Sequence, residues 1–307
     1  YKRQRYTTVA EEIDERHESV SEFSAGAVRF LFGLGKKMLL ANAVARIADA
    51  AFAAVMPSVL FAWLGAVAYT FQIYFDFSAY SDMAIGLGRM FGFHFLENFN
   101  YPYVARSVTE FWRRWHISLS TWFRDYVYIP LGGNRCSRAR NVWNLFVVWF
   151  LTGMWHGASW NFIAWGLWFF VLLVGEKFLW GKALERLPSL VRHAYAMVLV
   201  VFSWVLFRAE TLTAAAAYFA AMFGSSGVWC GSRVVYYALE FWPELLCCCI
   251  AALPVKQWLE TALQKRDAAP ARAVLTWGPK LAAMALLACS YCKLVTGSFN
   301  PFIYFRF

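Results

Sequence analysis

The sequence predicts an all-α, polytopic membrane protein, and its composition supports this fold class. Of its 307 residues, 60% are hydrophobic and 16% are charged, whereas a soluble domain averages about 45–50% apolar and about 25% charged residues. Apolar stretches of helical length recur along the chain, for example at 59–75, 194–207 and 274–295. The 16 Trp and 15 Tyr suit aromatic belts at membrane interfaces. A lipid bilayer is therefore the expected environment of this multi-pass chain.

The net charge of +10 does not indicate a nucleic-acid-binding protein. Basic residues occur in short runs between apolar spans rather than in one patch, which is typical of anchors on the cytoplasmic side of a membrane. The clearest run is the loop at 130–140, with Arg135, Arg138 and Arg140. We expect this loop to face the cytoplasm, and we expect no nucleic-acid partner.

The chain shows no internal repeat, so a single membrane domain over residues 1–307 is the simplest organisation. Residues 1–22 are polar and read as a cytoplasmic lead-in. The start YKRQRYTT, which has no Met, suggests a chain cut from a longer protein. Between 23 and 56, Lys36 and Lys37 interrupt an apolar pattern, which predicts a tilted or interfacial helix.

The seven cysteines do not predict a metal site. Cys289 and Cys292 form a CxxC pair, but no second CxxC or His pair completes a zinc ligand set. Cysteines in apolar runs behave as small hydrophobic residues.

The most informative segment is LTGMWHGASWNF, which places His156 between two long apolar runs. An imidazole there is removed from bulk water, and burial shifts its pKa. Ionisable groups in apolar spans usually face a cavity or pathway, although a core histidine bonded to a carbonyl is the alternative. We expect Gly153 and Gly157 to leave space beside the ring for a substrate chain.

Residues 109–125 predict one continuous amphipathic helix. Its aromatic face comprises Trp112, Trp115, His116, Leu119 and Trp122. Arg113, Arg114 and Arg124 lie on or beside its polar stripe. Such a helix lies at the membrane surface or lines a protein cavity. The alternative is that the arginines bind lipid headgroups and His116 only packs.

The segment YFDFSAYSDMAIGLGR places Asp76 and Asp82 in apolar surroundings, where a carboxylate is costly. Gln72, Asp76 and Tyr80 share one helix face, as do Ser78 and Asp82. These groups could satisfy one another in a polar network. They could also line a hydrophilic path for substrate, and both interpretations stay open.

Five motifs resemble the membrane-bound O-acyltransferase (MBOAT) superfamily, and within it the branch of the alginate O-acetyltransferase membrane subunit. The motifs are YFDFSAYSDMAIGLGRMFGF, NFNYPY, EFWRRWHISLSTWFRDYVYIPLGGNR, LTGMWHGASWNF and the terminal NPFIYFRF. The resemblance implies a bundle of transmembrane and re-entrant helices around a tunnel through the bilayer. It also implies that several N-terminal helices of the family are missing from this chain.

The resemblance assigns the catalytic role to His156, in the Trp155-His156-Gly157 motif, and a second essential role to His116. Trp115 and Trp155, beside the two histidines, would line the tunnel. The histidines are separated by 156 − 116 = 40 positions, so only the fold can bring them together. The arginines at 113, 114 and 124 could bind phosphates of the donor.

The implied reaction is acyl transfer, with acetyl as the expected group, from a cytoplasmic thioester such as acetyl-CoA or an acyl-carrier thioester. No tightly bound cofactor is implied. The acceptor would be a hydroxyl of an exported polysaccharide, reached directly or through a periplasmic or extracellular acetyltransferase partner, which places the chain in the inner or plasma membrane. Alternatives are D-alanyl transfer to a cell-wall polymer, a proton-coupled transporter using His156, Asp76 and Asp82, and a non-catalytic scaffold.

Overall fold

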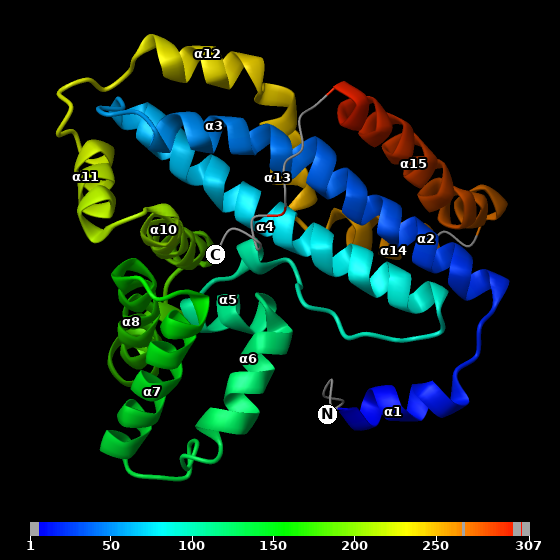
Figure 1. Ribbon diagram of the computed structural model, residues 1–307, viewed down its shortest axis with the longest axis horizontal. Helices are drawn as coiled ribbons and strands as arrows, with labels where there is room; N and C mark the ends of the chain where they lie inside the picture. The colour runs from blue at the N-terminus through cyan, green and yellow to red at the C-terminus, as the bar shows by residue number, and fades with distance from the viewer. Residues whose placement is uncertain (1–5, 266–267, 297–301, 303–307) are drawn as a thin grey trace. The chain divides into compact units, whose positions relative to one another are not determined.

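The computed structural model describes residues 6–265, 268–296 and 302, and within these residues every regular element is helical (Figure 1). This confirms the all-α prediction. The elements, in chain order, are α1 (Tyr6–Glu15), α2 (Val20–Gly35), η1 (Lys36–Ala41), α3 (Asn42–Phe52), α4 (Val59–Met90), η2 (Pro102–Val104), α5 (Val108–Arg114), α6 (Ile117–Phe123), η3 (Arg124–Tyr128), α7 (Arg138–His156), α8 (Trp160–Gly175), η4 (Glu176–Trp180), α9 (Gly181–Glu185), α10 (Ser189–Arg208), α11 (Leu212–Met222), α12 (Ser232–Glu240), α13 (Trp242–Ala251), α14 (Val255–Gln264) and α15 (Ala269–Thr296).

Among the described residues, four helical segments are long and apolar enough to cross a membrane. They are α4, the continuous segment Trp160–Glu185, α10 and α15. A fifth span results if α12 and α13, which meet at a 65° bend, form one broken span. These lengths agree with the predicted multi-pass membrane protein, since about 20 residues cross the hydrocarbon core.

The contacts divide the chain into two compact units, and each is described here by itself. The first comprises residues 6–44 and 71–98 together with the described residues from Pro243 onward. The second comprises Ala45–Thr70 and Phe99–Trp242. The histidines at 116 and 156 both belong to the second unit. The single domain expected over the whole chain stays a prediction.

In the first unit, α2 packs along α15, and the two lie side by side in Figure 1. A π-helical turn, η1, directly follows α2 and begins with the two adjacent lysines. Lys37 is buried and donates to Asp76 of α4 at 2.5 Å, while Lys36 donates to Asp82 at 2.6 Å. The tilted or interfacial helix expected at these lysines stays a prediction, and the structure shows their ammonium groups binding carboxylates within the unit.

Arg29 and Glu97 extend the same network of charges. Arg29 of α2 binds both Asp82, at 2.8 Å, and Glu97, at 2.5 Å. Tyr80 is partly exposed and packs edge-on against Phe302, whose ring also lies 4.7 Å from the Lys37 ammonium. Pairing of the two aspartates favours the polar-network interpretation. The path for substrate past Asp76, Asp82 and Tyr80 stays a prediction.

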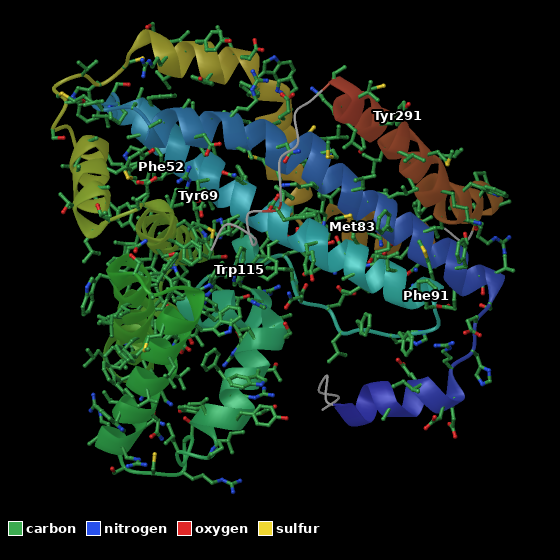
Figure 2. All side chains as sticks on the ribbon, viewed as in Figure 1. Phe52, Tyr69, Met83, Phe91, Trp115 and Tyr291 are labelled. Carbon is green, nitrogen blue, oxygen red and sulfur yellow. The ribbon has the colours of Figure 1, made fainter. Side chains whose placement is uncertain are left out.

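The second unit has an aromatic and aliphatic core. Phe52 at the end of α3 stacks on Tyr218 of α11 at 4.0 Å, and it lies 5.9 Å from Tyr69 of α4 (Figure 2). The Tyr218 hydroxyl donates to the Ala62 carbonyl at 2.9 Å, which ties α11 to α4. Helices α7 and α8 form the most extensive helix pair of the unit, and α8 also packs on α10.

We predict that replacing Lys37 alone lowers stability more than replacing both Lys37 and Asp76 by apolar residues. Lys37→Met leaves a buried carboxylate without its cation, which typically costs about 3–5 kcal/mol, whereas an apolar replacement of a whole buried pair is often neutral. Thermal melting of the detergent-solubilised protein should therefore show a lower Tm for Lys37→Met than for the double variant Lys37→Met/Asp76→Leu. Equal losses in the two proteins would show that the pair contributes no electrostatic constraint.

Candidate active site

His156 lies at the C-terminal end of α7, inside a box of aromatic rings from three helices. Trp165 of α8 meets the imidazole edge to face, with ring centroids 4.9 Å apart and an interplanar angle of 85°. Phe207 of α10 does the same at 5.1 Å and 84°. Trp155, the preceding residue, lies at 4.9 Å. The ring is half-buried, so it remains accessible within an apolar surrounding.

Close packing of α7 on α8 creates this box. A Cβ placed on Gly153 would lie 2.6 Å from the carbonyl oxygen of Phe162, and one on Gly166 would overlap the Trp149 carbonyl. Small residues permit such backbone contact between membrane helices. The expected space for substrate beside Gly153 and Gly157 is therefore filled, in one case by the backbone of α8 and in the other by the Phe162 ring.

The second histidine lies at a break in the helix that the sequence predicted to be continuous. Helix α5 ends at Arg114 and α6 begins at Ile117. His116 between them adopts the left-handed conformation, with φ 44° and ψ 55°. The expectation of one helix over 109–125 was wrong here, because a left-handed residue cannot continue an α-helix. Histidine tolerates this conformation better than most residues, and such strain is concentrated at functional sites.

The fold brings the two histidines together. The Trp155 ring lies 6.3 Å from His116, centroid to centroid, while Trp155 directly precedes His156. Burial lowers the pKa of His116, and a proton on His156 lowers it further. Because this pKa falls below its usual value near 6.5, His116 is neutral at physiological pH. Its Nδ1 also lies 3.3 Å from the Ser118 hydroxyl.

Trp115 joins the histidine pair to the aromatic core. Its ring packs against Trp204 of α10 at 4.9 Å and stacks on Phe111 of α5 at 5.6 Å. Phe99 meets it edge-on at 5.0 Å. Trp115 is therefore buried inside the unit, and whether it also lines a tunnel stays a prediction.

A cavity of about 160 Å³ lies between α5, α6 and η3 on one side and α7 on the other. Its polar lining is Ser120, Arg124, Tyr128 and Thr152, and the rest is aromatic or aliphatic. Thr152 precedes His156 by one helical turn, and Ser120 follows His116 by one turn. The cavity therefore runs beside both elements that carry the histidines.

The three arginines differ in their surroundings. Arg114 makes intramolecular contacts, because it binds Glu110 at 2.8 Å and donates to the Asn100 carbonyl. Arg113 is exposed. Arg124 borders the cavity and pairs with Asp125 at 3.0 Å. Phosphate binding by these residues stays a prediction, and Arg124 is the one positioned at a cavity.

Glu176 orients the short helix α5 and was missed by the sequence analysis. This buried carboxylate, in the π turn after α8, accepts the backbone N–H of Val108 at 2.7 Å and that of Thr109 at 2.8 Å. It also accepts the Thr109 hydroxyl at 2.6 Å. A carboxylate at a helix N-terminus satisfies orphan donors and favours the helix dipole. Glu176 thereby ties the α5–His116 element to α8, which carries Trp165.

Among the described residues, no group of three or more His, Cys, Asp or Glu side chains is arranged to hold a metal ion. The CxxC cysteines at 289 and 292 are both exposed on α15. Contacts of the two imidazoles include tryptophan and phenylalanine rings and the Ser118 hydroxyl.

Comparison with known proteins identifies the family to which the chain carrying these two histidines belongs. A profile of the MBOAT, membrane-bound O-acyltransferase family matches residues 6–216, more than half of the chain. The chain belongs to the MBOAT family. Both histidines and the cavity lie within the matched region.

Individual members of the family differ in the group they transfer. The chain is 41% identical to the probable alginate O-acetylase AlgI of Azotobacter vinelandii, over 99% of this chain and 66% of that protein. It is 40% identical to the peptidoglycan O-acetyltransferase of Helicobacter pylori, over 66% of this chain and 39% of that protein. It is 33% identical to the teichoic acid D-alanyltransferase of Bacillus subtilis, over 45% of this chain and 38% of that protein. The chain spans about two thirds of the length of the first of these MBOAT relatives.

We predict that His116→Gly abolishes activity without loss of stability. Glycine adopts the left-handed conformation freely, so it relieves about 1–2 kcal/mol of backbone strain that His116→Ala retains. Melting curves should show His116→Gly at least as stable as His116→Ala, while acyl transfer is lost in both. Wild-type turnover by either well-expressed variant would assign His116 to packing alone.

We predict that Glu176 is a positioning residue whose charge matters. Glu176→Gln replaces an acceptor oxygen by a donor facing backbone N–H groups, so α5 loosens and acyl transfer falls by about tenfold or more. Glu176→Asp keeps the carboxylate and should retain more activity at equal protein level. Glu185→Gln, on the exposed end of α9, is the matched control. Equal activity of the Gln and Asp variants would contradict the assignment.

Proposed function

We propose that this protein transfers an acetyl group from a cytoplasmic thioester to a hydroxyl destined for an exported polysaccharide. The observation that carries this proposal is the meeting of two histidines, 40 positions apart, in an aromatic site beside a cavity. Two O-acetylating relatives support acetyl as the transferred group. The acceptor is either the polymer itself or an extracytoplasmic acetyltransferase partner.

In this proposal His156 is the general base. It removes the proton of the attacking hydroxyl, and such catalysis contributes about 10²–10⁴-fold in rate. His116, held neutral by burial, avoids charge repulsion with the imidazolium that then forms on His156. The aromatic box limits access of bulk water, which protects a thioester from hydrolysis.

The remaining features concern the donor and the membrane. Arg124, at the edge of the cavity, would hold a phosphate of coenzyme A or of a phosphopantetheine arm. A cytoplasmic donor and an exported acceptor place the protein in the inner or plasma membrane, with the arginine loop at 130–140 facing the cytoplasm. No tightly bound cofactor is needed for this chemistry.

D-alanyl transfer is the second candidate, because a teichoic acid D-alanyltransferase is among the relatives. It uses the same acyl-transfer chemistry with a different acyl group. Feeding cells labelled acetate or labelled D-alanine and measuring which label becomes base-labile on the exported polymer distinguishes the two.

We predict that His156→Ala, in the full-length protein, abolishes O-acetylation of the exported polymer at normal membrane level. Loss of a general base lowers the rate by at least about 10²-fold, well beyond a packing perturbation. The measurement is the O-acetyl content of the polymer, with protein level checked by immunoblot. His94→Ala, which changes a mostly exposed histidine of the first unit, is the control. Near-normal acetylation by His156→Ala would rule out the proposed base.

A further inference from the structure

Three buried tryptophans, one of them in contact with His156, carry indole N–H groups without a hydrogen-bond acceptor among the described residues. They are Trp112 of α5, Trp165 of α8 and Trp204 of α10. Trp165 lies 5.8 Å from Trp112 and 6.2 Å from Trp204, centroid to centroid. Buried donors are almost always paired, so a cluster of unpaired ones needs a specific explanation.

Other tryptophans of the same unit do find acceptors. Trp168, one turn after Trp165 on α8, donates to the Leu199 carbonyl at 3.2 Å. Trp63 donates to the Met222 carbonyl at 3.1 Å, and Trp180 donates to the Tyr195 hydroxyl at 2.9 Å. The three unpaired indoles lie together, with Trp165 in ring contact with both Trp112 and Trp204.

Trp165 is the unpaired donor in direct contact with His156. Only 1% of its surface is exposed, and its ring meets the imidazole edge to face at 4.9 Å. Phe207 packs on both rings, at 5.2 Å from Trp165 and 5.1 Å from His156. An acyl group bound against this side of the imidazole would therefore have the indole ring of Trp165 as a neighbour.

We propose that the indole N–H of Trp165 donates a hydrogen bond to the carbonyl oxygen of the acyl donor bound beside His156. This inference rests on the acyl transfer proposed above and identifies the group that stabilises its developing negative charge. An indole N–H is a hydrogen-bond donor and not an acceptor, which suits it to an oxyanion.

In the proposed step, the acyl group moves directly from the thioester sulfur to the oxygen of the acceptor hydroxyl. His156 takes the proton of the acceptor hydroxyl while the hydroxyl oxygen bonds to the carbonyl carbon of the thioester. The former carbonyl oxygen becomes an oxyanion and accepts the hydrogen bond from Trp165. The carbon–sulfur bond then breaks, and the leaving thiolate takes the proton from the imidazolium. A preorganised donor to such an oxyanion contributes about 10²–10³-fold in rate.

The test compares Trp165→Phe with Trp168→Phe in the full-length protein. Both changes remove one indole from α8, but only Trp165 contacts His156. The readout is the initial rate at which labelled acetate enters base-labile esters of the exported polymer, divided by the membrane protein level. We expect a loss of about 10²-fold for Trp165→Phe and a loss within about threefold for Trp168→Phe.

A second variant separates the N–H group from the ring. Benzothienylalanine at position 165 keeps the bicyclic shape and replaces the N–H by sulfur, so it should lose activity even if Trp165→Phe fails to accumulate. Wild-type rates with benzothienylalanine would overturn the proposal and leave the indole as packing. His156→Ala, measured in parallel, distinguishes the two failures: an inactive His156→Ala beside a fully active position-165 variant contradicts only this inference.

Discussion

The backbone contact between α7 and α8 is the constraint on which the candidate site depends. Glycines at 153 and 166 allow the two helices to approach until carbonyl oxygens of one touch the main chain of the other. At this separation, the last turn of α7 presents His156 to Trp165 rather than to lipid. Without it, the imidazole would have no aromatic box, and the cost of an ionisable group in an apolar span would be uncompensated.

A second constraint, electrostatic in origin, acts between α8 and α5. The carboxylate of Glu176 is placed where the first N–H groups of α5 have no helical acceptor. The short helix is too brief to be stable alone, since isolated helices need about 12–15 residues. Its orientation is therefore set by contacts to α8 and by the aromatic packing of Trp115. His116 follows directly, so its place beside His156 depends on a group 60 positions along the chain, 176 − 116.

Much of the fold class could be predicted from the sequence, but less of the site. Composition and apolar periodicity predicted a helical membrane protein. The apolar surroundings of His156 and the aromatic helix face that carries His116 marked both histidines as candidate site residues. Periodicity could not reveal the break at His116, because a single left-handed residue leaves the aromatic pattern of 109–125 intact. Trp165 and Glu176 were missed for a different reason: their roles arise from contacts between distant segments. The glycines at 153 and 157 were predicted to leave space for substrate, but this space is filled by the backbone of α8 and by the Phe162 ring.

The π turn at η1 has a consequence for how the first unit tolerates insertions and deletions. Successive residues of an α-helix point about 100° apart, yet Lys36 and Lys37 both reach carboxylates of α4. A π turn accommodates one residue more than an α-helical turn. Its long hydrogen bond runs from the Asn42 N–H to the Lys37 carbonyl, so the surplus residue lies after Lys37 and the α-helical spacing from Arg29 to Lys36 is undisturbed. Deleting one residue after Lys37 would leave both lysines in register with Arg29 and would turn the residues that follow by about 100° around the helix axis. In homologous chains, loss of a residue in this turn should therefore leave the buried carboxylate and its lysine in place and be accompanied by changes in the residues that begin α3.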